Sequence, residues 1–206
     1  VDEAVLHQAL RYAAEKGHLH VVKYLVENCA RVDEAVLHQA LRYAAEKGHR
    51  HVVKYLVENC ARVDEAALHQ ALRYAAEKGH LDVVKYLVEN CGRVDEFRLH
   101  QALRHAAEEG HLYFVKYLVE NCGLADKFRL HQALDRAAER GRLDVVKYLV
   151  EKCGLADEFQ PHQALDGAAM GGHLDVVKYL VENCELADEF QLHQALDLAA
   201  MFGHLD

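Results

Sequence analysis

The stretch HQALRYAAEKGHLHVVKYLVENCA, residues 7–30, decides the fold because the chain repeats it. It returns at residues 38–61 with one change, Leu19 to Arg50, and related copies follow at a constant spacing of 31 residues. A period of this size is typical of solenoids, in which short structural units stack into an array. We therefore expect a single repeat array over residues 1–206, with repeats 1–31, 32–62, 63–93, 94–124, 125–155, 156–186 and the incomplete 187–206.

Each repeat predicts two amphipathic helices joined by a short turn. In the first copy Asp2 is a suitable N-cap, apolar residues follow at helical spacing as far as Ala14, and Gly17 stands where a helix stops. The same glycine stop recurs at Gly48 and Gly79, and a valine- and leucine-rich stripe predicts the second helix. Two such helices cannot bury both apolar faces alone, so neighbouring repeats must stack. The predicted fold is an all-α solenoid of helix-turn-helix repeats.

A family resemblance rests on the second half of each repeat. The third copy has AAEKGHLDVVKYLVENC at residues 75–91, and the pattern Ala-Ala-x-x-Gly-His followed by Val-Val-Lys-x-Leu resembles the ankyrin repeat. The period is 31 where the ankyrin repeat has 33, and the Thr-Pro-Leu-His motif of that family is absent. In place of the family's hairpin loop stands RVDEAVLH, residues 31–38, which predicts a lengthened first helix. The resemblance implies an ankyrin-like stack without projecting β-hairpins.

One histidine recurs in every repeat, always inside HQAL. Metal binding and proton transfer are the chemical interpretations, and a ring that satisfies backbone groups is the structural one. Helices pack about 10 Å apart, whereas zinc needs nitrogens within about 2.1 Å of one ion, so two rungs of this ladder cannot share a metal. We interpret the ladder as structural and expect no metal site: His7, His38, His69, His100, His131, His162 and His193.

A second histidine, His18 in the first repeat, follows the glycine stop, and the ankyrin resemblance implies a bridging role for it. The fifth repeat carries Arg142 in this slot, a replacement that a required metal ligand or catalytic base would not tolerate.

Cysteines also recur once per repeat, and equivalent positions lie too far apart for a disulfide, whose Cα atoms are at most about 7 Å apart. We expect Cys29, Cys60 and Cys91 to fill small apolar slots at the end of the second helix. Six thiols that do not pair suit a reducing compartment, so an intracellular, cytoplasmic location is expected.

Catalysis has little support in this sequence. The chain contains no Ser and no Thr, which removes hydroxyl nucleophiles, and it has no nucleophile elbow and no phosphate-binding loop. A Cys–His pair is the remaining alternative, but no oxyanion-hole motif accompanies it. We expect a protein that is not an enzyme and needs no cofactor.

Charge is distributed unevenly along the chain. Residues 1–155 carry 23 basic and 23 acidic side chains, and residues 156–206 carry 1 and 10, which together give the net charge of −9. A nucleic-acid partner needs clustered Lys and Arg, and a membrane span needs a long apolar run, so we expect neither. A basic or apolar protein partner fits better.

Substitutions between repeats concentrate on one face of the first helix. In the first repeat this face carries Tyr12, Glu15 and Lys16, and the resemblance places it on the exposed concave side of the stack. Variable residues on a constant framework are what a binding scaffold needs. The predicted partner-binding residues lie in the later repeats, where aromatic side chains, Met and Arg enter: Phe128, Arg136, Arg140, Phe159, Met170, Phe190, Leu198, Met201 and Phe202. The alternative is that Phe159 and Phe190 only pack between repeats and that sequence beyond Asp206 covers Met201 and Phe202.

Self-association is the alternative function. The first repeat nearly equals the second, and the last stops at Asp206, so neither end resembles the polar cap that a solenoid requires. We expect either a segment of a longer array or head-to-tail stacking of copies into a filament.

Overall fold

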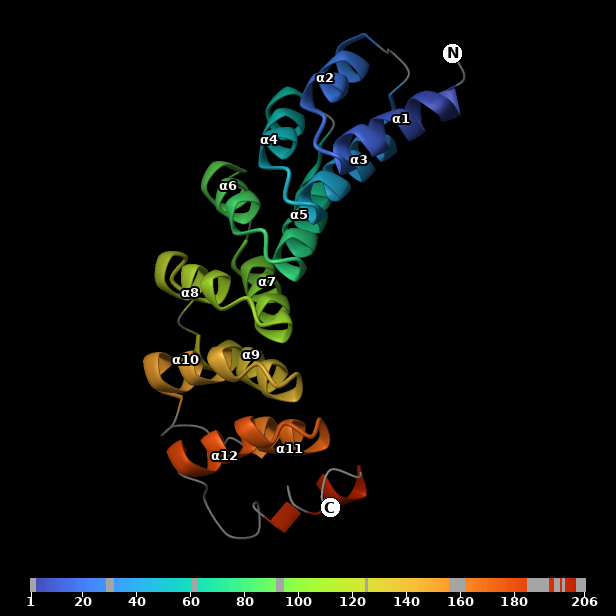
Figure 1. Ribbon diagram of the computed structural model, residues 1–206. Helices are drawn as coiled ribbons and strands as arrows, with labels where there is room; N and C mark the ends of the chain where they lie inside the picture. The colour runs from blue at the N-terminus through green and yellow to red at the C-terminus, as the bar shows by residue number, and fades with distance from the viewer. Residues whose placement is uncertain are drawn as a thin grey trace. The chain divides into compact units, whose positions relative to one another are not determined.

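The computed structural model describes residues 3–28, 32–60, 63–91, 95–124, 126–155, 162–184, 193–194, 197 and 199–202. This part of the chain forms pairs of α-helices and contains no β-strand, which confirms the predicted all-α, helix-turn-helix solenoid (Figure 1). The first helices of successive repeats are α1 (Glu3–Glu15), α3 (Glu34–Glu46), α5 (Glu65–Glu77), α7 (Glu96–Glu109), α9 (Lys127–Glu139) and α11 (His162–Met170). The second helices are α2 (Leu19–Asn28), α4 (Arg50–Asn59), α6 (Leu81–Cys91), α8 (Leu112–Asn121), α10 (Leu143–Cys153) and α12 (Leu174–Asn183).

An aspartate opens the first helices, as the sequence predicts. Asp33 Oδ1 accepts from the backbone N–H of Val36 at 2.8 Å, and Asp64 Oδ1 accepts from Ala67 at 2.7 Å. These bonds satisfy N–H groups that have no partner within the helix. Residues 34–38 are helical because of this start, so the expected lengthening of the first helix at the expense of a hairpin is confirmed.

A glycine closes each first helix. Gly17, Gly48 and Gly79 have φ of 73°, 76° and 73°, in the left-handed region. Around Gly48 the N–H of His49 donates to the carbonyl of Ala44 at 2.8 Å, and the N–H of Gly48 donates to Ala45 at 3.2 Å. This pair of bonds is the Schellman motif, which turns the chain sharply into the second helix.

The same glycine also leaves room for the next repeat. A Cβ placed on Gly48 would stand 2.5 Å from Nδ1 of His80, and one on Gly17 would stand 2.6 Å from Nδ1 of His49. Glycine is therefore required here twice over, by the backbone conformation and by the ring that packs against it.

The chain separates into two compact units, residues 1–102 and 103–206, and helix α7 runs across the boundary. In the first unit α1, α3 and α5 lie side by side, and α2, α4 and α6 form a second layer; in the second unit α9 packs on α11, and α8, α10 and α12 follow one another. The buried residues are mainly the Leu and Ala of the first helices and the Val and Leu of the second. The continuity of both units as one array stays a prediction.

The second helices are joined by tyrosine–glutamate hydrogen bonds. The hydroxyl of Tyr55 donates to Oε1 of Glu27 at 3.1 Å, and Tyr148 donates to Glu120 at 3.0 Å, in each case 28 residues earlier in the chain. Tyr179 repeats the contact with Glu151 at 3.0 Å. Within the described residues, no helix is long and apolar enough to cross a membrane.

Candidate functional site

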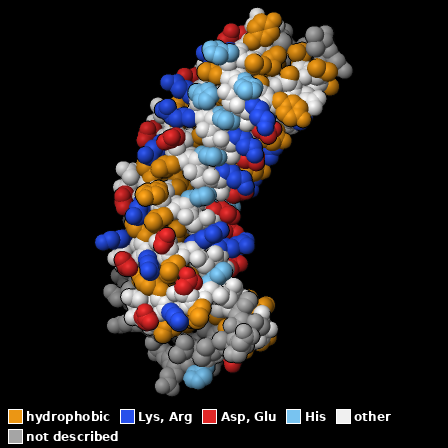
Figure 2. All heavy atoms as spheres, in the orientation of Figure 1, with side chains coloured by type: hydrophobic (Ala, Val, Ile, Leu, Met, Phe, Trp, Pro, Cys, Tyr) orange, Lys and Arg blue, Asp and Glu red, His pale blue; other side chains and the backbone are white. Residues whose placement is uncertain are grey.

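The turns between the two helices carry a row of histidines that connect successive repeats. In the first unit the ring Nε2 of His49 donates to the carbonyl oxygen of Glu15 at 2.9 Å, and His80 donates to Glu46 at 2.8 Å. Figure 2 shows histidine side chains following one another along the surface of this unit. Each acceptor is the last residue of the preceding first helix, so the bond satisfies a carbonyl at an exposed helix end.

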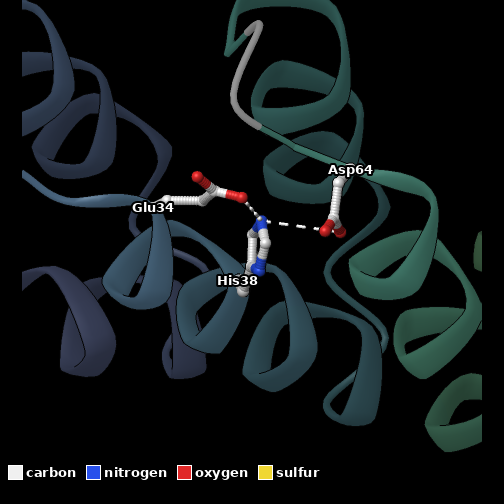
Figure 3. A group of neighbouring side chains, drawn as sticks. All are labelled: Glu34, His38 and Asp64. Carbon is white, nitrogen blue, oxygen red and sulfur yellow. Dashed lines mark ion pairs between the residues drawn. The ribbon is translucent and has the colours of Figure 1, made fainter.

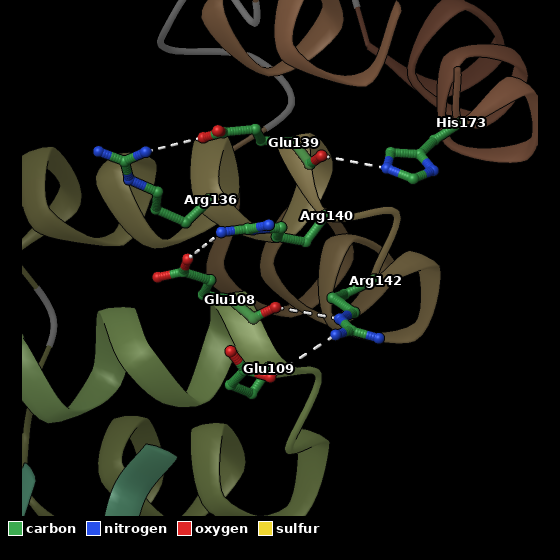
Figure 4. Close-up of polar contacts among 7 residues, drawn as sticks. All are labelled: Glu108, Glu109, Arg136, Glu139, Arg140, Arg142 and His173. Carbon is green, nitrogen blue, oxygen red and sulfur yellow. Dashed lines mark hydrogen bonds and ion pairs between the residues drawn. The ribbon is translucent and has the colours of Figure 1, made fainter. Parts of the chain in front are cut away.

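The second unit keeps this bond even where the histidine is replaced. Nε of Arg142 donates to the carbonyl of Glu108 at 3.0 Å, and Nε2 of His173 stands 3.0 Å from the carbonyl of Glu139 (Figure 4). Arg142 therefore reproduces the backbone contact of the histidine that it replaces. The bridging role that the family resemblance implies for this slot matches these contacts.

The histidines of the HQAL ladder lie on the first helices and are mostly shielded. Nδ1 of His100 donates to the carbonyl of Glu96 at 2.8 Å, and Nδ1 of His131 donates to Lys127 at 2.6 Å. These two rings are 5% and 6% exposed. His7, His38 and His69 lie at the same position of their helices and are half-buried, His193 is exposed, and the side chain of His162 lies outside the described part.

The cysteines end the second helices. Cys60 and Cys184 are buried, and Cys122 and Cys153 are half-buried. Burial raises the pKa of the Cys153 thiol to about 11, which keeps it protonated and unreactive at neutral pH. Cys29 and the side chain of Cys91 lie outside the described residues.

The exposed face of the first helices in the first unit is covered by stacked arginine and tyrosine. The Arg42 guanidinium lies 4.3 Å from the ring centroid of Tyr43 and 5.1 Å from that of Tyr74. Its Nη1 also donates to the hydroxyl of Tyr74 at 3.4 Å. Cation–π and hydrogen-bond contacts of this kind occupy the slots that the sequence predicts to face a partner.

The corresponding face of the second unit is a network of ion pairs. Nη1 of Arg136 is 2.7 Å from Oε2 of Glu139, and Nη2 of Arg140 is 2.9 Å from Oε1 of Glu108 (Figure 4). The Arg140–Glu108 pair connects α9 with α7. Both arginines were predicted to contact a partner, and both are exposed.

A hollow of about 370 Å³ opens on this face between α7, α9 and α11. It is lined by Arg104, Gln132, Asp135, Arg136, Glu139, Gln163 and Gly167. Burial raises the pKa of the Asp135 carboxyl from its ordinary value of 3.8 to about 6, although nearby Arg136 opposes the shift. A carboxylate held in such a place favours a cationic group beside it.

Asp135 and Gly167 were missed as site residues, although the sequence holds a signal for each. Asp135 stands where the first four repeats have Arg11, Arg42, Arg73 and Arg104, so the charge of this slot reverses along the chain. Gly167 occupies the slot of Tyr12, and the missing side chain leaves the hollow open. Only the three-dimensional packing shows that the two slots face the same space.

The predicted partner-binding residues are not all brought together. Arg136 lines the hollow, whereas Phe128 lies in the first turn of α9, a helix of 13 residues and about 20 Å in length. Phe128, Met170, Met201 and Phe202 are 62%, 42%, 78% and 52% exposed. Phe159, Phe190 and Leu198 fall outside the described residues, so the role predicted for them stays a prediction.

A family model and a solved structure each match most of this chain. A family model described as ankyrin repeats (3 copies) matches residues 10–98, 72–160 and 134–206. The crystal structure of the human ASB11 ankyrin repeat domain is similar, with 26% identity, a TM-score of 0.67 and coverage of 92% of this chain and 90% of that one. No curated protein sequence matches the chain. The chain therefore belongs to the ankyrin repeat family, whose stacked helical repeats serve as scaffolds for protein–protein interaction.

Proposed function

We propose that this protein is a non-catalytic scaffold that binds a basic segment of another protein on the exposed face of its first helices. The hollow between α7, α9 and α11 is the proposed contact point. The observation that carries the proposal is the Asp135 carboxyl inside this hollow, whose pKa burial raises to about 6.

The environment of Asp135 favours a cation. The lining carries Arg104 and Arg136 against Asp135 and Glu139, and Arg136 is paired with Glu139 at 2.7 Å. At neutral pH the Asp135 carboxyl is ionised and half-buried, which costs free energy unless a positive group accompanies it. A Lys or Arg side chain from a partner would supply that charge and fill part of the volume.

An exposed methionine and an acidic C-terminal segment add to this proposed contact. Met170 ends α11 and is 42% exposed, so it offers a flexible apolar surface beside the hollow. Residues 156–206 carry 10 acidic and 1 basic side chain, a charge that attracts a basic segment from a distance. A segment that combines Lys or Arg with apolar residues suits both.

The first unit fits the same role less specifically. Its Tyr12, Tyr43 and Tyr74 repeat at 31-residue intervals, and Arg42 lies over Tyr43 and Tyr74. This unit therefore supports the array and presents a regular surface. No cofactor enters the proposal, and the cytoplasm stays the expected location.

The test is selection of binders from a displayed random peptide library on immobilised residues 1–206, followed by affinity measurements on the selected peptides. Enrichment of Lys and Arg is expected. Asp135→Asn should weaken binding at least tenfold, since a desolvated charge pair is worth several kcal/mol. Gly167→Tyr, which restores the side chain of the first three repeats, should block the hollow. Asp144→Asn, an exposed aspartate on α10 of the same repeat, is the matched control.

Two outcomes would overturn the proposal. Peptides without basic residues, or affinities equal in the Asp135→Asn and Asp144→Asn variants, would remove the hollow as the contact point. Light scattering of the unliganded chain over a concentration series tests the alternative function, self-association. A mass that rises steadily above 23.3 kDa would identify a self-assembling structural protein.

A further inference from the structure

Three ligand-type side chains meet where one first helix passes the start of the next. Nε2 of His38 lies 3.7 Å from Oε1 of Glu34, one turn earlier on α3, and 3.7 Å from Oδ1 of Asp64, which caps α5 (Figure 3). The three side chains point toward one another across the junction between the second and third repeats (Figure 3). His38 is half-buried, and the two carboxylates are exposed to solvent.

The arrangement recurs one repeat later with Glu65, His69 and Asp95. Nε2 of His69 is 3.7 Å from Oε1 of Glu65, and in both groups the three ligand atoms lie within 4.8 Å of one another. Both groups belong to the first compact unit. A repeated grouping of one imidazole and two carboxylates needs a common explanation, because each places two negative charges near one imidazole ring.

We propose that each group is a binding site for a divalent transition-metal ion of the zinc type, held by one histidine nitrogen and two carboxylate oxygens. Bonds of about 2.0–2.2 Å in tetrahedral geometry place ligand atoms about 3.3–3.6 Å apart. The ligand atoms now lie 3.7 Å apart in the N–O pairs and within 4.8 Å across each group, and side-chain rotations would shorten these separations to that value. Imidazole favours zinc over magnesium or calcium, and water completes the coordination.

The ladder's own hydrogen bonds favour the nitrogen that the ion needs. His100 and His131 both donate Nδ1–H to the carbonyl four residues earlier, at 2.8 Å and 2.6 Å. Because a carbonyl only accepts, Nδ1 carries the proton in these rings and Nε2 keeps its lone pair. Among the described residues, Nε2 of His100 is buried without a hydrogen-bond partner. A proton on Nδ1 of His38 and His69 would leave the Nε2 lone pair, 3.7 Å from Glu34 Oε1 and Glu65 Oε1, available to the ion.

The aspartate ligand is already held in place. Asp64 Oδ1 accepts from the N–H of Ala67 at 2.7 Å, which fixes the carboxylate at the start of α5. Hydrogen bonds to metal ligands orient them and raise affinity in the same way. Glu34 and His38 are four residues apart, a spacing that places both side chains on one helix face.

The sites do not conflict with the spacing of the histidine ladder. Two rungs are too far apart to share an ion, but each proposed site needs only one rung, with its third ligand from the cap of the following repeat. The fifth repeat has Lys127 in the slot of Glu34, so the sequence contains an unsuitable copy of the same group.

The experiment is a titration of residues 1–206 with zinc chloride, followed by calorimetry and native mass spectrometry. The double variant Asp64→Asn/Asp95→Asn removes one ligand charge from each site but keeps the helix caps, since Asn caps as well as Asp. It should weaken the two tightest sites at least tenfold, because loss of a ligand exceeds the 10–100-fold effect of an outer-shell partner. The control, Asp144→Asn/Asp175→Asn, changes two exposed aspartates on second helices and should bind as the unaltered chain does.

A second measurement locates the ion. Mn²⁺ or Co²⁺ should broaden or shift the backbone amide signal of Ala67 and leave that of Leu130, which follows Lys127, unaffected. The competing result is metal on the exposed His51 and its half-buried neighbour His49, whose ring centroids are 6.1 Å apart. Unchanged zinc affinity in the Asp64→Asn/Asp95→Asn variant, with effects centred on the His49 turn, would show adventitious binding and overturn the proposal.

Discussion

Arg142 donates from Nε to the carbonyl oxygen of Glu108 at 3.0 Å, the same contact that His49 makes with Glu15 and His80 makes with Glu46. The contact depends on an N–H at the right distance from the backbone and not on an imidazole. The side chain in this slot is therefore exchangeable wherever its donor reaches the preceding helix.

Replacement of Arg142 should follow this donor requirement. Arg142→His should change the free energy of unfolding by less than about 0.5 kcal/mol, whereas Arg142→Ala should lower it by about 1 kcal/mol through the lost hydrogen bond. Urea unfolding followed by circular dichroism measures both. Equal losses in the two variants would show that the Arg142–Glu109 ion pair at 3.8 Å matters more than the backbone contact.

Replacement of glycine by alanine should destabilise the protein at Gly48 and stabilise it at Gly167. Gly48→Ala should destabilise by about 2 kcal/mol or more, because φ is 76° and the new Cβ would stand 2.5 Å from His80 Nδ1. Gly167→Ala should stabilise α11 by about 0.5–1 kcal/mol, since its Cβ meets Glu139 at an ordinary 3.5 Å. Thermal melting of the two variants beside the parent chain tests the pair, and a shared sign would contradict the local geometry.

Tyr55 should lose its proton only at high pH, and its hydrogen bond to Glu27 should stabilise the stacked helices. Burial, and then its hydrogen bond to Glu27, raises the pKa of Tyr55 to about 12. The folded protein therefore holds this proton more tightly than the unfolded chain does, and the associated stability is present below pH 10 and lost as pH rises toward 12. Tyr55→Phe should cost about 1 kcal/mol at pH 7, while Tyr113→Phe, at a residue 79% exposed, should cost nothing measurable. The difference in absorbance at 295 nm between the parent chain and Tyr55→Phe follows the ionisation of Tyr55, and a midpoint at the ordinary value of 10.0 would refute the assignment.

Asp135 should make stability depend on pH in the opposite direction to an ordinary carboxylate. Burial raises its pKa to about 6, so folding retains a proton that the unfolded chain has released by pH 6. A penalty therefore develops as pH rises from about 4 to 6 and stays constant above. Relative to the parent chain, Asp135→Asn should gain stability on the order of 1 kcal/mol at pH 7.5 and none at pH 4. Chemical unfolding at both pH values, with Asp144→Asn as the control, provides the comparison; an equal difference at pH 4 and pH 7.5 would exclude the titration.

Local signals were sufficient to predict the fold. Asp33 and Gly48 delimit a first helix through bonds to their own neighbours, so residue type and spacing determine them. For the same reason the described residues contain no β-hairpin, because the chain is already helical from Glu34. The 31-residue period then requires stacking.

The candidate site depends on contacts between residues that are distant in sequence. The hollow forms because Gly167 and Asp135, on adjacent helices, face one space, and neither residue alone predicts it. The Tyr55–Glu27 bond likewise joins side chains of two different helices, 28 residues apart in sequence. Such pairings are set by how far one helix is rotated against the next, which a single-helix pattern does not contain.

The bridging hydrogen bonds have a mechanical consequence. Their partners are separated by 28 or 34 residues, so each connects a repeat only with its immediate neighbour. Pulling the two ends apart should therefore peel repeats off one at a time, and each event would release about 100 Å of extended chain per 31 residues. Optical-tweezer traces should show successive steps of equal extension, because the array lengthens under force and refolds one repeat at a time.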